Sequence, residues 1–280
     1  MPTAAELARL APPGILLRPV PMIHSVVMFS TDEIKENMRR SYSLGLPNLK
    51  QLIDSEKNQK ALIVGGGPSV DQQWDKIKAL QGQGYRVVAI ERILNRCCQA
   101  GVIPEYVLAI DASDDVWESF DSPPQSTRYL ISSQCRPDVF EALKDCPVFL
   151  FNSHQSEAYD GYGETIGDVD GVQINTGGSV VIGAMAVAMT LGMADLHVFG
   201  FDCHIGEGAY AQGITGQGGQ NKYIKVRIED RDFDTTMAYM AFAQQFFILR
   251  EFGRKLGLLD SIKIYGDSLV NALSREDMRG

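Results

Sequence analysis

The chain has 280 residues, of which 45% are hydrophobic and 22% charged, and its formal net charge at pH 7 is −9. This length and composition can bury a full hydrophobic core, so we expect a globular protein with one large domain, or one domain with an extension. The acidic balance disfavours a nucleic-acid backbone as partner, because that affinity comes mainly from clustered Lys and Arg. A nucleotide needs only local amides and one or two cations, so it stays compatible with this charge.

Membrane and redox signals are missing from the sequence. No apolar run approaches the ~20 residues of a membrane span, and the first residues lack the basic start and apolar core of a signal peptide. The sequence therefore predicts a cytoplasmic protein. Its five cysteines include no pair with the C-x-x-C spacing of a zinc or redox site, which favours free thiols.

The first 60 residues differ from the rest. Four prolines between residues 12 and 21 interrupt the start, and Thr31 then begins a pattern similar to a capping box. Apolar residues from Ile34 to Ile53 form one stripe, interrupted midway by a glycine and a proline, which predicts two short helices. We expect residues 1–60 to be a helical N-terminal extension and residues 61–280 to be a nucleotide-binding domain.

From Ala61 onward, strand-like runs alternate with helix-length segments. This alternation predicts an α/β fold of the Rossmann-like type, a mainly parallel sheet with helices on both faces. A long amphipathic helix over residues 234–256, capped by Asp234 and Thr235, is expected near the end. The predicted strands are residues 61–64, 86–90, 106–110, 129–132, 148–151, 172–174, 196–199 and 262–264.

Three consecutive glycines follow the first predicted strand, in the segment ALIVGGGPSV. Gly65, Gly66 and Gly67 let the backbone come close to a ligand, and Pro68 suits a first helical position because its missing N–H would be unpaired there anyway. The amides that follow, at and beyond Ser69, attract anions. We therefore interpret residues 65–69 as a nucleotide-binding turn.

This turn differs from two better-known relatives. No lysine follows Gly67, as a P-loop requires, so a P-loop kinase is disfavoured. The dinucleotide fingerprint G-x-G-x-x-G is matched at Gly65 and Gly67, but Val70 stands where the third glycine allows close packing, which disfavours an NAD site. Glu91, at the end of the next predicted strand, could hydrogen-bond a ribose as the fingerprint's acidic residue does. The alternative is a tight turn without a ligand.

A second glycine-bearing turn comprises Asn175, Thr176, Gly177, Gly178 and Ser179. It follows a short predicted strand and precedes an apolar, alanine-rich segment that is typical of a buried helix. Two such turns in one α/β domain could hold a nucleotide from opposite sides. The alternative is that the two glycines only let the buried helix begin close to the sheet.

Carboxylates and histidines near strand ends are the candidate reactive groups. Asp111 and Asp202 each follow a predicted strand, where a carboxylate can hold Mg²⁺ beside a di- or triphosphate or orient a substrate hydroxyl. The alternative for Asp111 is a helix cap. His204 lies beside Asp202, so we take these two as the candidate catalytic residues, with His204 as general acid or base. His154 competes for that role.

A glycine-rich tract and a basic segment follow His204. Residues 206–219 contain six glycines and predict either a lid that orders on ligand binding or an inert loop. The basic side chains beyond the tract could neutralise phosphates or form the solvated edge of a sheet. They are Lys222, Lys225, Arg227 and Arg231.

Three motifs in this order resemble the 6-hydroxymethylpterin diphosphokinase MptE-like family. They are GGGPSV after a strand, Pro104 followed by VLAID, and GGSVVIGAMAVAMTLGMADLHVFGFD, and the similarity covers roughly residues 35–205. That family includes the central domains of motility accessory factors and is similar to the sialyltransferase fold that binds a CMP-sugar. The resemblance implies a Rossmann-like nucleotide-binding domain, with residues 65–69 and 178–179 in the pocket and Asp111 and Asp202 near a metal or an acceptor.

Three functions fit these residues. The first is a transferase that moves a diphosphate from ATP to a pterin-like hydroxymethyl acceptor, assisted by Mg²⁺. The second is a glycosyltransferase that uses a nucleotide-sugar such as a CMP-sugar, with His204 or His154 acting at the acceptor and without dependence on metal. The third is a non-catalytic nucleotide-binding module. The expected partners are a small-molecule nucleotide and an acceptor that the sequence does not identify. The sequence does not indicate the oligomeric state.

Overall fold

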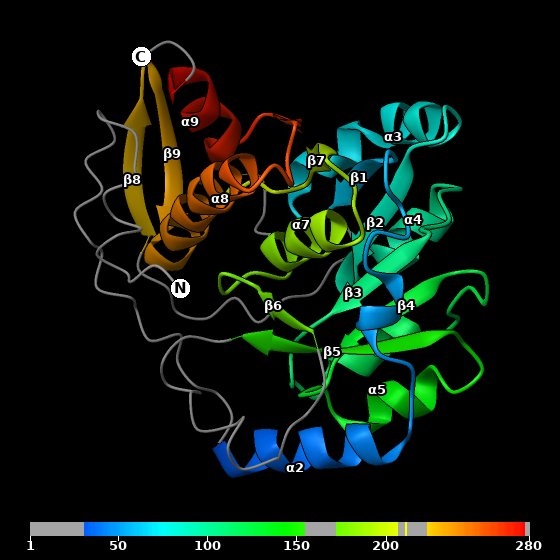
Figure 1. Ribbon diagram of the computed structural model, residues 1–280. Coiled ribbons are helices and arrows are strands. Elements are labelled where there is room, and N and C mark those ends of the chain that lie inside the picture. Colours follow the sequence, from blue (N-terminus) through cyan, green and yellow to red (C-terminus); the bar gives the residue numbers. More distant parts are fainter. Residues whose placement is uncertain (1–30, 155–171, 207–210, 212–222, 278–280) are drawn as a thin grey trace.

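A parallel sheet of eight strands forms the centre of the protein (Figure 1). The computed structural model describes residues 31–154, 172–206, 211 and 223–277. The strand order is β10-β7-β1-β2-β3-β4-β5-β6, and neighbouring strands run parallel. These strands are β1 (Lys60–Val64), β2 (Arg86–Ile90), β3 (Tyr106–Ala109), β4 (Arg128–Ser132), β5 (Val148–His154), β6 (Gln173–Asn175), β7 (Asp195–Phe199) and β10 (Ser261–Ile264).

The sheet is buried on both faces, which explains the continuous apolar runs of its strands. All four residues of β3 are buried, as are the last four of β1, β2 and β7. Parallel strands need this double cover because their crossover helices lie on the faces of the sheet. The predicted Rossmann-like α/β fold is confirmed, and each of the eight predicted strands is present. The largest difference is at β5, which continues to His154 instead of ending at residue 151.

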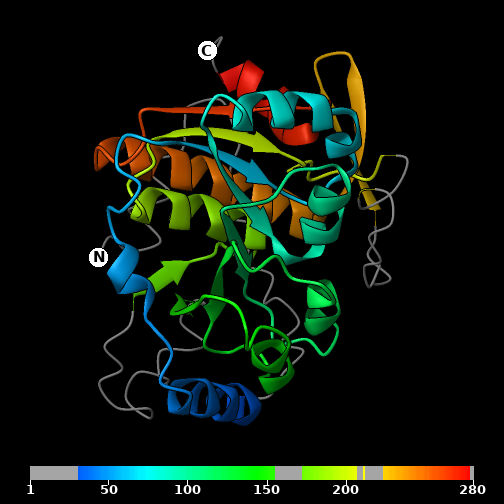
Figure 2. The same cartoon turned by 90° about the vertical axis from the view of Figure 1, so that its right-hand side faces the viewer.

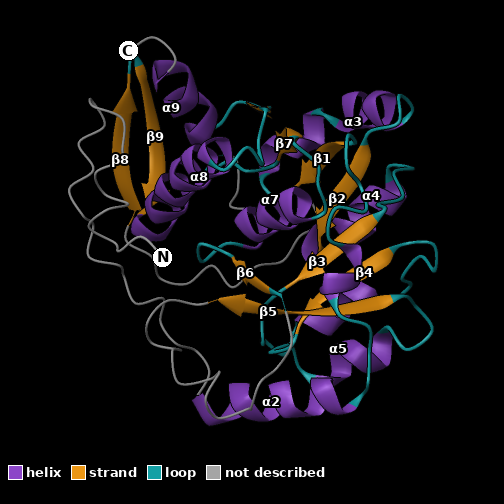
Figure 3. Cartoon of the chain, in the orientation of Figure 1, coloured by secondary structure: helices purple, strands orange, loops and turns teal. Residues whose placement is uncertain are grey.

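Helices lie on both sides of the sheet (Figures 1 and 3). Helix α7 contacts β1, β2 and β3 on one side, with α8 packed beside it, and α3 and α4 lie on the other side. Gly183 in α7 is needed there, because a Cβ on it would lie 2.9 Å from Cδ1 of Ile110. The helices are α2 (Thr31–Ser43), α3 (Trp74–Gln81), α4 (Leu94–Gln99), α5 (Pro137–Ala142), α7 (Val180–Thr190), α8 (Met237–Lys255) and α9 (Leu269–Asp277), with 3-10 turns η1 (Leu49–Leu52), η2 (Pro68–Gln72), η3 (Glu91–Ile93) and η4 (Val116–Phe120).

The chain reverses its direction across the sheet between β6 and β7. From β1 it proceeds outward through β2, β3, β4, β5 and β6, and α7 then carries it back to β7 on the other side of β1. Such a reversal leaves a crevice beyond the carboxyl ends of the two strands on either side of it, here β1 and β7. This is the usual ligand-binding position in open α/β sheets.

The described part of the predicted N-terminal extension packs on the main sheet. Helix α2 begins at Thr31, and the Ser41 hydroxyl donates to the carbonyl of Ser133 over 2.9 Å. Leu49 is buried in the main core, and Asn48 forms a parallel bridge with Leu150 of β5. Helix α2 lies at the opposite end of the molecule from α9 (Figure 2). Residues 1–30 of the predicted extension lie outside the described residues.

An antiparallel hairpin of β8 (Tyr223–Ile228) and β9 (Arg231–Thr236) stands apart from the main sheet (Figure 3). The predicted start of the last long helix is wrong, because Asp234 and Thr235 pair with β8 in this hairpin. Helix α8 begins at Met237 instead, and its N-cap Thr236 accepts a hydrogen bond from the amide of Tyr239. Of the helices in the described ranges, none combines the length and apolar character that a membrane crossing requires.

Candidate functional site

The predicted glycine turn lies at the carboxyl end of β1, directly against the end of β7. The amide of Gly65 donates to the carbonyl of Phe199 over 2.8 Å, and that of Gly67 donates to Gly200 over 2.9 Å. A Cβ on Gly65 would lie 2.5 Å from the Gly200 oxygen, and Gly200 itself has φ +65°. The glycines therefore let two backbones touch at the point where the chain order reverses.

Most amides of this turn already have acceptors within the protein, contrary to the expectation from the sequence. Besides those of Gly65 and Gly67, the amide of Val70 donates to the carbonyl of Gly67, and that of Ser69 donates to Asp202. The carbonyl of Gly66 accepts a hydrogen bond from Ala211, a residue of the glycine-rich tract. That residues 65–69 contact a nucleotide stays a prediction. The backbone amides of Gly67, Ser69 and Val70 already donate to acceptors within the protein.

Asp202 fixes the glycine turn through Ser69. Its Oδ2 accepts from the Ser69 amide at 2.8 Å and its Oδ1 from the Ser69 hydroxyl at 2.5 Å. The Asp202 side chain is 4% exposed, and burial raises the pKa of this carboxyl while the bonds from Ser69 act in the opposite direction. A Cβ on Gly67 would lie 2.7 Å from Oδ2. The carboxylate is thus enclosed and bound to the turn on both oxygens.

His204 is held at the same strand end by backbone and aromatic contacts. Its Nδ1 lies 3.3 Å from the backbone oxygen of Asp202, and its ring meets the ring of Phe233 edge-on at 5.4 Å. The preceding residue, Cys203, has φ +54°, and Ile205 donates to the carbonyl of Asp234 in β9. His204 is partly exposed, so it keeps its candidacy as the acid or base. The competing residue, His154, ends β5, and the structure describes its backbone only.

Asp111 and Asp202 follow strands that are not neighbours. Strands β1 and β2 lie between β3 and β7, so with a spacing of about 4.8 Å per strand the two strand ends are roughly 14 Å apart. Oxygen ligands of one Mg²⁺ lie about 2.1 Å from the ion, and therefore within roughly 4 Å of each other. In the described ranges, no group of three or more His, Cys, Asp or Glu side chains is arranged to hold a metal. The residues present do not fit one Mg²⁺ shared by these two aspartates.

Asp111 instead interacts with Glu91, at the end of the neighbouring strand β2. The Glu91 side chain is 0% exposed, and neither of its carboxyl oxygens has a hydrogen-bond partner in the described part of the chain. Burial, together with the nearby Asp111 carboxylate, raises the pKa of Glu91 to about 8. Nε of Arg92 lies 3.7 Å from Oε1 of Glu91, and Nη2 of Arg92 lies 3.3 Å from Oδ2 of Asp115. As enclosed here, Glu91 reaches a ribose only if the covering side chains move.

The second predicted turn meets the first one at the start of α7. Gly177 and Gly178 have φ +54° and +77°, and a Cβ on Gly178 would lie 3.3 Å from the ring of Phe242 in α8. Ser179 is the N-cap of α7 but makes no side-chain cap hydrogen bond. In the first turn of α7, Cγ2 of Val181 lies 2.8 Å from a Cβ built on Gly65. The structure thus places the first glycine turn against the start of α7, the helix that follows the second turn.

The other members of the second turn lie around its backbone. Asn175 is exposed and accepts a hydrogen bond from the amide of Gly177 over 2.9 Å, whereas Thr176 is 2% exposed. The amide of Ser179 donates to the carbonyl of Thr176. The turn therefore has both packing contacts and an exposed edge, and its predicted contact with a nucleotide stays a prediction.

The predicted basic segment forms the β8–β9 hairpin, and its described charges have acidic partners. Nζ of Lys225 lies 3.4 Å from Oδ1 of Asp234, and Nη1 of Arg227 lies 3.8 Å from Oδ1 of Asp232. The two aspartates belong to β9. Arg231 forms two hydrogen bonds with Asp267. Lys222, and the predicted lid apart from Gly206 and Ala211, lie outside the described residues.

Two further glycines shape this site, and one of them, Gly266, was not singled out from the sequence. Gly200 adopts a left-handed conformation against Gly65, and Gly266 (φ +93°) packs on Ser69 so closely that a Cβ would lie 2.6 Å from that of the serine. Both follow predicted strands, at 196–199 and 262–264. A glycine directly after an apolar strand was the available signal for Gly200.

The fold and this strand-end site define a class of protein, a Rossmann-like α/β protein with a glycine turn at its topological switch point. The family model described as "6-hydroxymethylpterin diphosphokinase MptE-like" matches residues 32–208, which is more than half of the chain. The chain belongs to the MptE-like family, as its motifs indicated. A search of curated proteins finds no match.

A solved structure shares this fold. It is the MAf glycosyltransferase from Magnetospirillum magneticum AMB-1, which superposes with a TM-score of 0.60 at 15% sequence identity. The match covers 89% of this chain but only 41% of the glycosyltransferase. This chain therefore corresponds to about two fifths of that protein, and at such low identity the likeness concerns the fold.

Proposed function

We propose that this chain is a nucleotide-dependent transferase that binds its nucleotide in the crevice between β1 and β7. The observation that carries the proposal is the glycine turn at residues 65–69, locked against Gly200 at the switch point of the sheet. Ligands of open α/β sheets bind in that crevice. The start of α7 meets the turn there through Val181, and membership of the MptE-like family supports a transferase.

The donors around the crevice suggest how the nucleotide lies. The amides of Gly67 and Ser69 are occupied, and the Asp202 carboxylate would repel a phosphate at that end of the turn. Helix α7 has no side-chain cap bond at its start and no acidic residue in its first turn, so its first amides favour an anion. We place the nucleoside at the glycine turn and its phosphates toward Ser179 and the first turn of α7.

The transferred group is a glycosyl group or a diphosphate. Transfer from a nucleotide-sugar fits the geometry better, since it needs no shared metal site between Asp111 and Asp202. In this reaction the bond from the sugar carbon to the phosphate breaks, the acceptor oxygen bonds to that carbon, and His204 accepts the acceptor proton. The name of the solved neighbour, a glycosyltransferase, agrees with this choice.

Diphosphate transfer from ATP to a pterin-like hydroxymethyl acceptor is the second candidate, and the family description favours it. The ion pairs of Lys225, Arg227 and Arg231 with acids are exposed, so they would compete only weakly with a triphosphate. A third candidate, a non-catalytic nucleotide-binding module, would bind without turnover.

Thermal unfolding with a panel of nucleotides tests the proposal. A ligand that binds only the folded state raises the melting temperature, so CMP, a CMP-sugar, UDP-sugars, ATP and NAD are each added with Mg²⁺ and with EDTA. A rise with a nucleotide-sugar that persists in EDTA supports glycosyl transfer, and a rise with ATP that needs Mg²⁺ supports diphosphate transfer. No rise with any nucleotide contradicts the proposal. Release of free nucleotide during incubation with acceptors then separates an enzyme from a binding module.

A further inference from the structure

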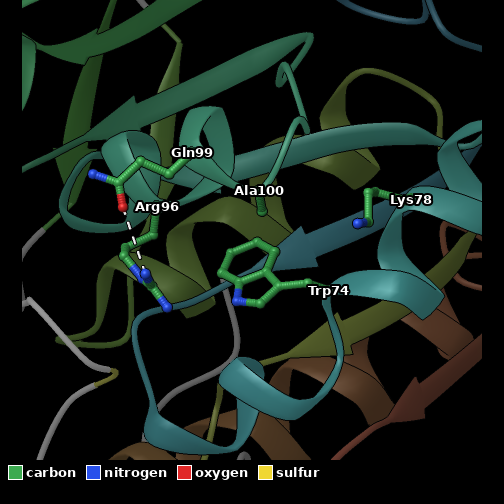
Figure 4. Close-up of a pocket in the computed structure, with 5 residues that line it drawn as sticks. All are labelled: Trp74, Lys78, Arg96, Gln99 and Ala100. Atoms are coloured by element: carbon green, nitrogen blue, oxygen red, sulfur yellow. Dashed lines mark hydrogen bonds between the residues drawn. The ribbon is translucent and has the colours of Figure 1, made fainter.

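A cavity of about 300 Å³ lies between helices α3 and α4, outside the crevice of the proposed function (Figure 4). Trp74 begins α3 and Lys78 lies one turn further along it, whereas Arg96 and Gln99 belong to α4 and Ala100 ends that helix. None of these five lining residues belongs to either glycine turn. The cavity is therefore a separate candidate for a ligand.

Two nitrogen donors on the walls of this cavity lack acceptors. The indole Nε1 of Trp74 and the Nε of Arg96 are both buried, and neither has a hydrogen-bond partner among the described residues. Leaving a buried donor unpaired is unfavourable, and native proteins contain few such groups. An acceptor from outside the chain that displaces the side chains covering these atoms would satisfy both donors.

The charges around the cavity favour a negatively charged ligand. Two of the five lining side chains are cationic and none is acidic, although the whole chain has a net charge of −9. The other side of the Arg96 guanidinium is bound to Asp71 at 2.8 Å, which fixes its orientation and leaves the Nε edge unused. The ion pair of Lys78 with Asp75 is exposed, so it competes weakly with a ligand.

The shape of the cavity adds a flat apolar wall. Arg96 and Lys78 lie on either side of the indole ring of Trp74, and the methyl group of Ala100 points toward that ring (Figure 4). An aromatic ring favours stacking or edge contact with another ring. Trp74, Arg96 and Lys78 together match a molecule that joins a ring to an oxyanion.

We propose that the cavity between α3 and α4 binds a small aromatic oxyanion, a carboxylate or a phosphate carried on a flat ring. The ring lies against Trp74, and the oxyanion accepts hydrogen bonds from Arg96 and Trp74, while Lys78 attracts it electrostatically from the other side of the indole ring. This site does not depend on the proposed transferase function, because it shares no residue with the crevice.

Tryptophan fluorescence provides a direct test. The chain has two tryptophans, and Trp117 is exposed, so the Trp117→Phe protein reports on Trp74 alone. Benzoate, phenyl phosphate and inorganic phosphate are the three probes. We expect a saturable change in Trp74 emission with benzoate or phenyl phosphate at roughly millimolar concentration, which corresponds to about −4 kcal/mol of binding. The tighter of these two probes identifies the oxyanion.

Charge variants assign the signal to the cavity. Arg96→Gln should weaken binding about tenfold or more, as expected for loss of a charge-assisted hydrogen bond, and Lys78→Met should weaken it by a smaller factor. Lys76→Met is the matched control, because Lys76 lies on the same helix but over the ring of Tyr265, and it should leave binding unchanged. The proposal is overturned if neither aromatic probe gives a saturable change, if inorganic phosphate binds equally well, or if binding survives in both cavity variants.

Discussion

Ser69 donates two hydrogen bonds to the carboxylate of Asp202, one from its amide and one from its hydroxyl, across 133 residues of sequence. The pair ties the end of β1 to the end of β7 and encloses a carboxylate within the glycine turn. A residue that the sequence suggests as a metal ligand or catalyst thus has a structural role at the centre of the proposed site.

Removal of either partner should destabilise the protein. Ser69→Ala leaves an oxygen of the buried Asp202 carboxylate unpaired, and Asp202→Ala removes the acceptor of both Ser69 donors, so we expect each to lower the free energy of unfolding by about 1–3 kcal/mol. The double variant should lose less than the sum, with a coupling energy of about 1 kcal/mol or more. Urea unfolding of the four proteins measures this cycle, and strictly additive losses would show that the two side chains act independently.

Gly67→Ala should be much more damaging than an alanine at an open glycine. The added methyl group would lie 2.7 Å from Oδ2 of Asp202, so the turn must shift. We expect a loss of about 1–3 kcal/mol, typical of overpacking, together with weaker nucleotide binding. Gly82→Ala is the control, because its nearest neighbour is 3.4 Å away at a right-handed helix end. Equal melting temperatures for these two variants would contradict the close contact.

Glu91→Gln should stabilise the protein at neutral and alkaline pH. The pKa of Glu91 is raised from 4.5 to about 8, so the folded wild type holds a proton that the unfolded chain releases between these values. Wild-type stability therefore falls as the pH rises from about 4.5 to 8, and glutamine removes this dependence. Differential scanning calorimetry at pH 5, 7 and 9 should show a growing advantage for the variant.

The exposed Glu118 provides the control for this experiment. Glu118→Gln should show no comparable change with pH, because its carboxyl group is not enclosed. If Glu91→Gln instead has the same advantage over wild type at every pH, the raised pKa is wrong.

Thr236→Ala should lower the free energy of unfolding more than Asp234→Ala does, although the sequence pattern predicts the aspartate as the helix cap. Thr236 accepts from the amide of Tyr239 as the N-cap of α8, and loss of such a cap costs about 1 kcal/mol. Asp234 contributes only an exposed ion pair with Lys225, worth about 0–1 kcal/mol. Chemical denaturation of both variants compares the two costs, and the reverse order would place the cap at Asp234.

Local patterns predict much of this fold but few of its side-chain pairs. The apolar runs of β1, β2, β3 and β7 identify the inner strands, since a strand buried on both faces has a continuous signal, whereas β6 and β10 are partly exposed. Asp234 and Thr235 mislead because the same residues suit a helix cap and a hairpin, and only pairing with β8 decides between them. The sequence predicts that Glu91 follows a strand, but the burial of its side chain depends on neighbouring loops.

The site requires contacts between distant segments. A glycine triplet indicates a close backbone approach without saying whether a ligand or a second strand makes it. Here Gly200 makes the close backbone approach. Ser69 lies within hydrogen-bond distance of Asp202 only because β7 pairs with β1. For the same reason the separation of Asp111 from Asp202 follows from the strand order, which sequence periodicity does not contain.

The central claim is that a nucleotide binds in the crevice between β1 and β7, and hydrogen exchange tests it most directly. Amide exchange is measured by mass spectrometry with and without a saturating CMP-sugar, and separately with ATP and Mg²⁺. We predict slower exchange in residues 65–70 and 179–183 with at least one of these ligands, while α5 stays unchanged. Binding that protects other segments and leaves both glycine turns unaffected, or no binding of either nucleotide, would contradict the claim.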